Sequence, residues 1–142
     1  MVTYQVVGKV INVRILLATS NNHKLKEVRE ILEPKGFQVD GLDVLEESCP
    51  EPIENGETFE ENARIKAVEY ANSTGIRCMA DDSGLSVDAL NGKPGVHSAR
   101  FSGKGDTREE RDTENNKLLL KQMSKISATN RSARFVCAIC VA

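Results

Sequence analysis

The sequence has few aromatic residues, no excess of positive charge and no long apolar run, and each shortage excludes a class of protein. Aromatic residues make up 4% of the 142 residues and tryptophan is absent, so few side chains could stack on a planar ligand. The 19 lysines and arginines are outnumbered by 21 aspartates and glutamates, whereas general nucleic-acid binders carry excess basic charge. No apolar run approaches the ~20 residues that cross a bilayer. We therefore expect no nucleic-acid partner and no membrane partner.

Cysteine is also scarce, and its four residues are scattered along the chain. A chain of this length can bury a core without disulfides. Cys137 and Cys140 form a Cys-x-x-Cys pair in a strand-like segment, where residues three apart point to opposite faces and cannot be bridged. The first residues, MVTYQVVGKVINV, are too polar for the core of a signal peptide. These features predict a cytoplasmic protein with reduced cysteines.

Strand-like and helix-like segments alternate along the chain. Residues 13–19 form a short apolar run typical of a strand, and apolar residues at helical spacing follow in residues 24–32. Residues 40–57 are acidic and contain two prolines, so we expect a loop there. Thr58 and Thr107 each begin the Thr-x-x-Glu pattern of a capping box, which predicts a helix after each of them. The alternation favours one α/β domain whose ligands bind where strands end and helices begin.

The last segment, residues 132–141, predicts a further strand. Its sequence is nearly all apolar, and a continuous apolar run is typical of a strand that is buried on both faces of a sheet. Such a strand would be covered on both faces in a complete sheet.

The turn after the first predicted strand carries groups suited to a phosphate. Residues 16–24 read LLATSNNHK, so a buried strand leads through a small polar turn into a helix. The helix N-terminus offers free N–H groups and the positive end of the helix dipole, and Lys24 adds a compact positive charge. The glycines of a P-loop are absent. The spacing alone leaves open whether this is a phosphate-binding turn or an ordinary capped turn with a surface lysine.

Two adjacent carboxylates, Asp81 and Asp82, follow the apolar stretch that ends at Ala80. We interpret that stretch as the end of a buried strand, with a possible further strand in residues 85–90. On an extended chain the two side chains point to opposite sides, so only one of them would face a given pocket. A carboxylate at a strand exit near a phosphate-binding turn is a hard-oxygen ligand for Mg²⁺. The alternative is a pair that caps a surface turn.

A second carboxylate and a second cation come from the segment around Thr58. Glu54 precedes the predicted helix, and Lys66 lies on the same helical face as Asn62, four residues earlier. Glu54 could therefore share a metal with the aspartate pair while Lys66 meets a phosphate. Each residue alone could equally be solvated surface charge, but the joint arrangement favours a site for an anion and a metal.

Three segments, LLATSNNHKLKEVREIL, ENGETFEENARIKA and ADDSGLSVDALNGKPGVHSARFSG, resemble the inosine triphosphate pyrophosphatase family. They stand in the order of the family's motifs. The resemblance implies an α/β fold with a central mixed β-sheet and flanking helices. It implies an Mg²⁺-dependent hydrolase that converts ITP, dITP or XTP to the monophosphate and pyrophosphate, and it implies a homodimer.

The resemblance also implies roles for individual residues. The acid two residues before the motif glycine binds the metal, which here is Glu54. The second aspartate of the Asp-Asp-Ser-Gly motif, here Asp82, binds the metal and accepts a proton from the attacking water. The substrate-binding residues implied in the same way are Thr19, Ser20, Asn21, Asn22, His23, Lys24, Lys66 and Ser83.

The chain departs from the family pattern at both ends. Residues 1–13 precede the usual family start and are predicted to be an N-terminal extension, with a partial domain of this family in residues 14–142. Family members continue past the position of Ala142 with Gly-Phe-Gly-Tyr-Asp and Ser-His-Arg segments that hold the purine. In the family further strands and a helix also follow the last strand, so we expect a fold incomplete at its C-terminal end, with one face or edge of that strand open. Two functions are compatible with this pattern. One is a nucleoside triphosphate pyrophosphatase; the other is a truncated, non-catalytic paralogue or fragment that binds polyphosphate weakly or associates with a full-length copy.

Overall fold

The structure is a computed structural model that describes residues 13–45 and 49–142. The predicted N-terminal extension, residues 1–13, lies outside the described residues except for Val13. The strands are β1 (Val13–Leu17), β2 (Phe37–Asp40), β3 (Cys78–Val87) and β4 (Ala133–Val141). The α-helices are α1 (Asn22–Leu32), α2 (Phe59–Thr74) and α3 (Arg108–Met123), and short 3-10 turns cover Glu33–Lys35, Leu42–Val44, Asp88–Leu90, Gly95–Arg100 and Ala128–Asn130.

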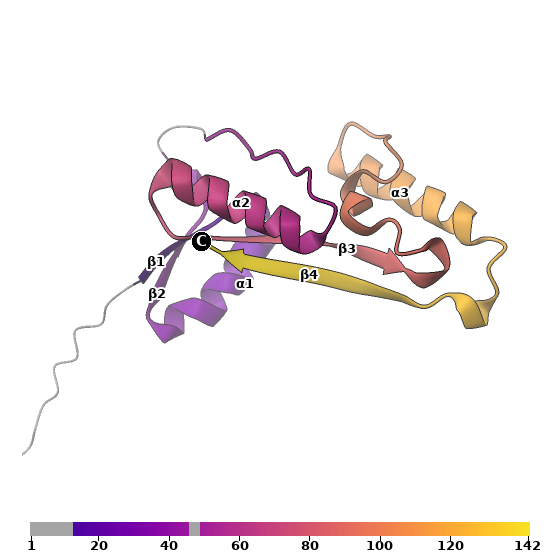
Figure 1. The fold of residues 1–142 in the computed structure, drawn as a ribbon, viewed down its shortest axis with the longest axis horizontal. Coiled ribbons are helices and arrows are strands. Elements are labelled where there is room, and N and C mark those ends of the chain that lie inside the picture. The colour runs from indigo at the N-terminus through magenta and orange to yellow at the C-terminus, as the bar shows by residue number, and fades with distance from the viewer. Residues whose placement is uncertain (1–12, 46–48) are drawn as a thin grey trace, which may run out of the picture.

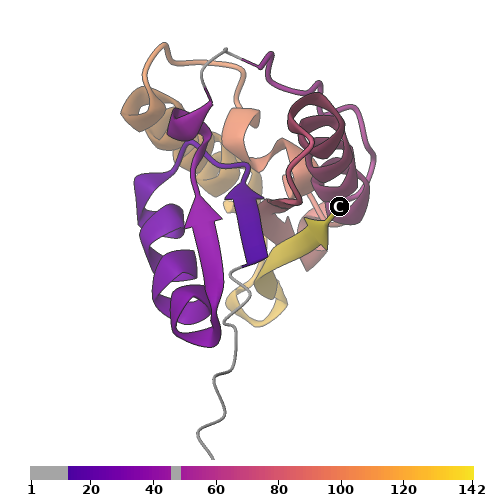
Figure 2. The same cartoon turned by 90° about the vertical axis from the view of Figure 1, so that its left-hand side faces the viewer.

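Over the described residues the four strands form one mixed sheet in the order β2-β1-β3-β4 (Figure 1). β1 is parallel to β2 and β3, and β4 is antiparallel to β3. Helices α1 and α2 lie on opposite faces of this sheet (Figure 2). This arrangement confirms the predicted α/β fold with a central mixed sheet and flanking helices.

Local signals set the ends of the helices. The side chain of Asn21 accepts hydrogen bonds from two N–H groups of the first turn of α1. Thr58 and Thr107 form complete capping boxes with Glu61 and Glu110 at the beginning of α2 and α3. Helix α2 ends at Gly75, whose left-handed backbone favours glycine. The predicted helices are therefore confirmed. Their ends could be predicted because each capping signal involves residues within a single helical turn.

Strand β3 is longer than predicted and runs through the aspartate pair. It pairs with β4 from Met79 to Val87 without interruption, so Asp81 and Asp82 lie inside a strand and not at its exit. The possible further strand over residues 85–90 is the end of β3 followed by a 3-10 turn. The prediction failed because both charges find partners on other elements, which makes a charged strand interior tolerable.

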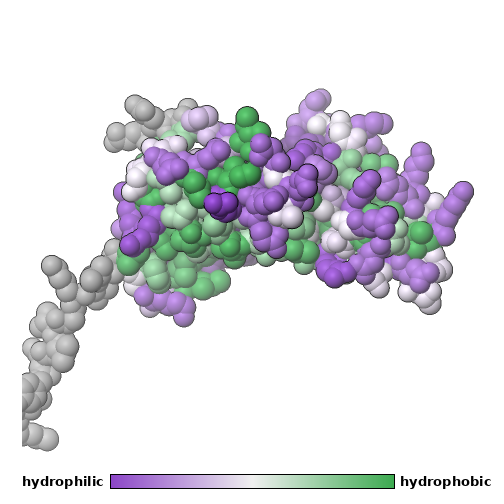
Figure 3. Space-filling view, in the orientation of Figure 1, coloured by the Kyte–Doolittle hydropathy of each residue, from purple (hydrophilic) through white to green (hydrophobic). Residues whose placement is uncertain are grey.

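Strand β4 lies at the edge of the sheet formed by the described residues, which confirms the expectation that one face or edge of the last strand is open. Its alternate residues are half-buried toward α2, whereas Phe135, Ile139 and Val141 are 86%, 65% and 54% exposed. Apolar side chains gather over the region where β4 runs (Figure 3). Apolar composition predicts a strand, but it does not tell an edge strand with one open face from a central one.

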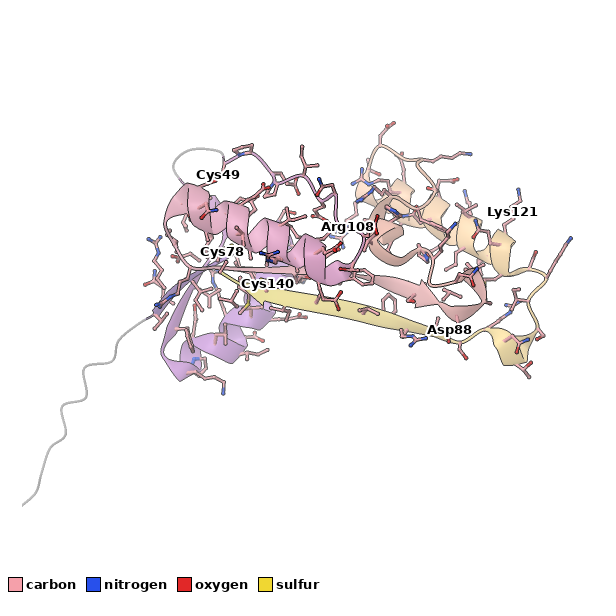
Figure 4. The ribbon with its side chains drawn as sticks, in the orientation of Figure 1. Cys49, Cys78, Asp88, Arg108, Lys121 and Cys140 are labelled. Carbon is pink, nitrogen blue, oxygen red and sulfur yellow. The ribbon has the colours of Figure 1, made fainter. Side chains whose placement is uncertain are left out.

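The core lies between the sheet and α2. Its buried residues come from β1 and the residue after it, from α2 and from β3: Leu16, Ala18, Ala67, Tyr70, Cys78 and Ala80. Cys140 of β4 packs against this cluster near Cys78 (Figure 4). All four cysteines are free thiols, as predicted, and burial raises the pKa of Cys78 to about 11. Among the described residues, no helix combines the length and the apolar composition that a membrane span requires.

Candidate functional site

A cavity of about 250 Å³ opens beyond the end of β1. Seven of the sequence-predicted residues line it: Thr19, Ser20, Lys24, Glu54, Lys66, Asp82 and Ser83. The other lining residues are Ala18, Leu42, Glu51, Tyr70 and Asp81. Sites that enclose a whole small molecule usually measure ~300–1,000 Å³, so this cavity suits part of a ligand.

The cavity exists because β1 is shorter than its neighbour β3. β1 pairs with β3 only at Leu16 and Leu17, whereas β3 continues to Val87. Beyond Met79, no strand of residues 13–45 and 49–142 lies beside β3 on the β1 side, so a cavity at this point is open to groups from both faces of the sheet. Asp81 and Asp82 therefore both line one cavity although they point to opposite faces, and the prediction that only one of them would face a given pocket is wrong.

The segment from Thr19 to Lys24, which spans the turn and the beginning of α1, contributes three residues to the cavity and keeps three out of it. Thr19, Ser20 and Lys24 line the cavity. Asn21 instead caps the helix, accepting bonds from the N–H groups of His23 and Lys24, and Asn22 and His23 are exposed. The structure thus assembles half of the predicted turn at the cavity. The other half shapes the helix or faces away from it.

Asp81 lies on the α1 face of the sheet and forms an ion pair with Lys24. The side chain of Asp81 is 14% exposed and that of Lys24 is 38% exposed. The Lys24 ammonium also lies 3.4 Å from the Ser83 hydroxyl. An ammonium has three donors that rotate together, so Lys24 can keep Asp81 and still donate to a ligand.

Asp82 lies on the α2 face and has a neutral partner. Its Oδ2 accepts a hydrogen bond of 3.0 Å from the amide of Asn62, and its Oδ1 accepts one of 3.0 Å from the N–H of Ser83. Burial raises the pKa of Asp82 above its ordinary value, and the nearby charge of Glu54 raises it further. The Asn62 bond and the charge of Lys66 act in the opposite direction. Asp82 is therefore a carboxylate whose negative charge is poorly compensated.

Glu54 lies in the loop before α2, 3.1 Å from the ammonium of Lys66. Both side chains are largely buried, with 23% and 14% of their surfaces exposed. The structure thus brings together the predicted carboxylate and the predicted second cation.

The cavity carries an excess of negative charge. Four carboxylates line it, those of Glu51, Glu54, Asp81 and Asp82, against the two ammonium groups of Lys24 and Lys66. A polyphosphate would be repelled by this excess unless a cation entered with it. Within residues 13–45 and 49–142, no group of three or more histidine, cysteine, aspartate or glutamate side chains is arranged to hold a metal ion. A metal here would therefore be held by one or two carboxylates and complete its coordination with water or with oxygens of the bound molecule.

Three lining residues were missed by the sequence analysis: Leu42, Glu51 and Tyr70. Leu42 and Glu51 lie in the stretch interpreted only as an acidic loop. Tyr70 follows Lys66 by one helical turn, a spacing that could have placed it on the same face of α2. Burial raises the pKa of Tyr70, and the charge of Glu51 raises it further.

The fold and the cavity together define an α/β protein with a site for a charged ligand. The sequence model of the Ham1 family matches residues 15–142, and the chain belongs to this family. A dITP/XTP pyrophosphatase of Exiguobacterium sp. is 50% identical over 129 residues, which are 91% of this chain and 62% of that protein. A dITP/XTP pyrophosphatase of Frankia alni is 51% identical over 126 residues, 88% of this chain and 61% of that protein.

A solved HAM1 protein from Coxiella burnetii has a TM-score of 0.80 at 40% identity, and the match covers 91% of this chain and 62% of that one. A nucleoside-triphosphatase, dITP/XTP pyrophosphatase, from Mycobacterium abscessus has a TM-score of 0.74 at 46% identity, over 90% of this chain and 64% of that one. The chain spans about three-fifths of the length of these relatives. The comparisons confirm the resemblance and the fold inferred from the three motifs.

Proposed function

We propose that this chain carries the triphosphate- and metal-binding part of an enzyme that hydrolyses ITP, dITP or XTP to the monophosphate and pyrophosphate. The single observation that supports it most is the convergence of Lys24, Lys66, Glu54 and Asp82 on one cavity from four separate elements. The similarity to proteins named dITP/XTP pyrophosphatase supports the choice of substrate.

In this proposal the two lysines and the turn at Thr19 and Ser20 bind the triphosphate. Lys24 reaches the cavity from the N-terminal turn of α1 and Lys66 from α2. The two cations therefore approach from opposite faces of the sheet. Two charges on opposite sides of a polyanion fix its position as well as its affinity.

Asp82 is the proposed proton acceptor. A water oxygen attacks the α-phosphorus, the bond from that phosphorus to the bridging oxygen breaks, and pyrophosphate leaves with the electron pair. The water proton passes to the carboxylate of Asp82. The raised pKa of Asp82 suits this role, because a base with a higher pKa accepts a proton more readily.

Glu54 and Asp82 are the proposed ligands of Mg²⁺. The residues fit this ion, because both are carboxylates and each oxygen of Asp82 accepts only one hydrogen bond and keeps a free lone pair. The two excess negative charges of the cavity match one divalent cation. When bound, Mg²⁺ would neutralise phosphate charge and polarise the reacting phosphoryl group.

The remaining parts of the proposal are a homodimer and a cytoplasmic location. The four free thiols are compatible with a reducing compartment. The homodimer is inferred from the family resemblance and the location from the cysteines, and both are separate from the chemistry of the cavity.

The proposal is tested by measuring pyrophosphate release from dITP and from dATP with Mg²⁺, and again after the metal is chelated. We expect pyrophosphate release that stops when the metal is removed. Because the cavity gathers groups suited to the phosphates and the metal, release from dITP and from dATP should be similar, and a strong preference for dITP would show that some residue of this chain contacts the base. Binding of inorganic tripolyphosphate without turnover of dITP would instead favour the non-catalytic alternative. Release of orthophosphate in place of pyrophosphate would contradict the proposed bond cleavage.

A further inference from the structure

A fully buried amide connects the two proposed metal ligands. Asn62 has no exposed surface, although burial of a polar side chain is costly unless its hydrogen bonds are made. Both ends of its amide are used. The nitrogen donates to Oδ2 of Asp82 at 3.0 Å, and the oxygen accepts from the N–H of Gly56 at 2.8 Å.

These two bonds join a helix, the loop just before it and a strand 20 residues further along the chain. Asn62 lies in the first turn of α2, whose position is set by the Thr58 capping box. Asp82 is in the interior of β3, and Gly56 is two residues after Glu54 in the preceding loop. The helix thus holds the strand that carries one carboxylate and the loop that carries the other.

Lys66, one turn further along α2, also contacts this loop, but through the carboxylate of Glu54. That contact must weaken if the carboxylate binds a metal. The Asn62 contact uses the backbone of Gly56 and leaves the Glu54 side chain free, so it can persist in the loaded site. The N–H of Glu57 also donates to the carboxylate of Glu61 on α2, at 2.7 Å, but Asn62 is the contact that holds the loop and Asp82 together in both states.

We propose that Asn62 is a positioning residue that keeps Asp82 and Glu54 at the separation at which they bind one divalent cation together. This inference rests on the proposed metal-binding role of those two carboxylates. Loss of a hydrogen-bond partner of metal ligands typically weakens metal binding 10–100-fold. We expect Asn62→Ala to weaken binding of Mn²⁺ by about this factor.

The chain offers a matched control in Asn115, another buried amide, in α3. It donates to the carbonyls of Ser98 and Ala99 and accepts from the N–H of Ser102, and neither it nor its partners line the cavity. Asn115→Ala removes a comparable buried amide and should lower stability without changing Mn²⁺ affinity.

Gly56→Ala gives a second route to the same test, independent of whether Asn62→Ala folds. A Cβ on Gly56 would lie 2.7 Å from Oδ1 of Asn62, so the loop must shift while the amide itself remains. It should also weaken Mn²⁺ binding.

The experiment titrates Mn²⁺ into the whole chain and its variants, with free Mn²⁺ measured by electron paramagnetic resonance and folding by circular dichroism. We expect the wild type and Asn115→Ala to bind equally, Asn62→Ala and Gly56→Ala to bind more weakly, and Asp82→Asn to lose binding. Wild-type affinity in both folded Asn62→Ala and Gly56→Ala overturns the positioning role, as does an equal loss in Asn115→Ala. Unchanged binding in Asp82→Asn overturns the proposed metal site itself, and with it this inference.

Discussion

Two neighbouring aspartates on opposite faces of β3 have different hydrogen-bond and charge partners. On the α1 face Asp81 is paired with the ammonium of Lys24, so its charge is neutralised by a full positive charge. On the α2 face Asp82 receives only neutral donors from Asn62 and Ser83, with Lys66 and Glu54 acting from further away. Adjacent residues of one strand therefore have unlike electrostatic surroundings.

This difference separates a carboxylate that holds another side chain in place from one that is available to react. A carboxylate that has a lysine partner can bind a metal only by weakening that ion pair, as Glu54 would with Lys66. A carboxylate that is buried among neutral donors retains its capacity for a metal and for a proton. In the proposed function, Asp82 therefore binds the metal and accepts the proton. Asp81 instead positions Lys24, the lysine proposed to bind phosphate.

The largest effect is expected for Asp82→Asn. An amide neither accepts the water proton nor supplies a charged metal ligand, so dITP turnover should fall by about a thousandfold or more. Pyrophosphate release under single-turnover conditions measures this loss. Asp40→Asn is the control, because Asp40 is equally buried but pairs with Arg14 away from the cavity. Retention of a tenth of the wild-type rate would show that Asp82 is not the proton acceptor.

A smaller loss is expected for Asp81→Asn. Lys24 would lose its ion pair but keep its place on α1, so kcat/KM for dITP should fall by about tenfold, mainly through KM. Steady-state kinetics separate the two parameters. A thousandfold loss in kcat would place Asp81 in the chemistry and remove the distinction between the two faces.

The pH dependence of stability should have opposite signs at two buried aspartates. The raised pKa of Asp82 means that its stabilising contribution is present at acidic pH and is lost as the pH rises through that pKa. Asp82→Asn should therefore raise the melting temperature by a few degrees at neutral pH and by less at acidic pH.

Asp40 behaves in the reverse way, because its hydrogen bond to Arg14 lowers its pKa. Its contribution is present at neutral pH and is lost as the pH falls through the lowered value. Asp40→Asn should lower the melting temperature at neutral pH, and this deficit should shrink in acid. Thermal unfolding of both variants over a range of pH checks the two signs, and equal signs would contradict the assigned surroundings.

The smallest effect is expected for Ser83→Ala. The side chain of Ser83 is 3.4 Å from Lys24, a weak contact, whereas the bond that Ser83 makes to Asp82 comes from its backbone and survives the substitution. The KM for dITP should change by no more than about threefold. A loss in kcat of a hundredfold would mean that the hydroxyl acts directly on the substrate.

The sequence predicted the parts of the fold that depend on neighbours within one turn. The capping residues Asn21, Thr58 and Thr107 correctly predicted where the helices begin. Half of the residues predicted to bind phosphate in the segment after β1 line the cavity. Strand β2 was missed because its four residues were partly assigned to an acidic loop, and its pairing with β1 is a tertiary property.

The electrostatic difference between Asp81 and Asp82 could not be predicted from the aspartate pair alone. Asp81 meets a lysine 57 residues away and Asp82 an asparagine 20 residues away, so their partners depend on how α1 and α2 pack against the sheet. For the same reason Glu51 and Tyr70, which line the cavity from a loop and a helix, were not predicted to belong to the site.

The most direct test of the comparison is the Mg²⁺ dependence of dITP turnover by Asp81→Asn beside the wild type. If the metal belongs to Asp82 and Glu54, the Mg²⁺ concentration at half-maximal rate should be unchanged in Asp81→Asn, although the KM for dITP rises. A requirement for about tenfold more Mg²⁺ in this variant would mean that Asp81 also binds the metal, and would contradict the division of roles between the two faces of β3.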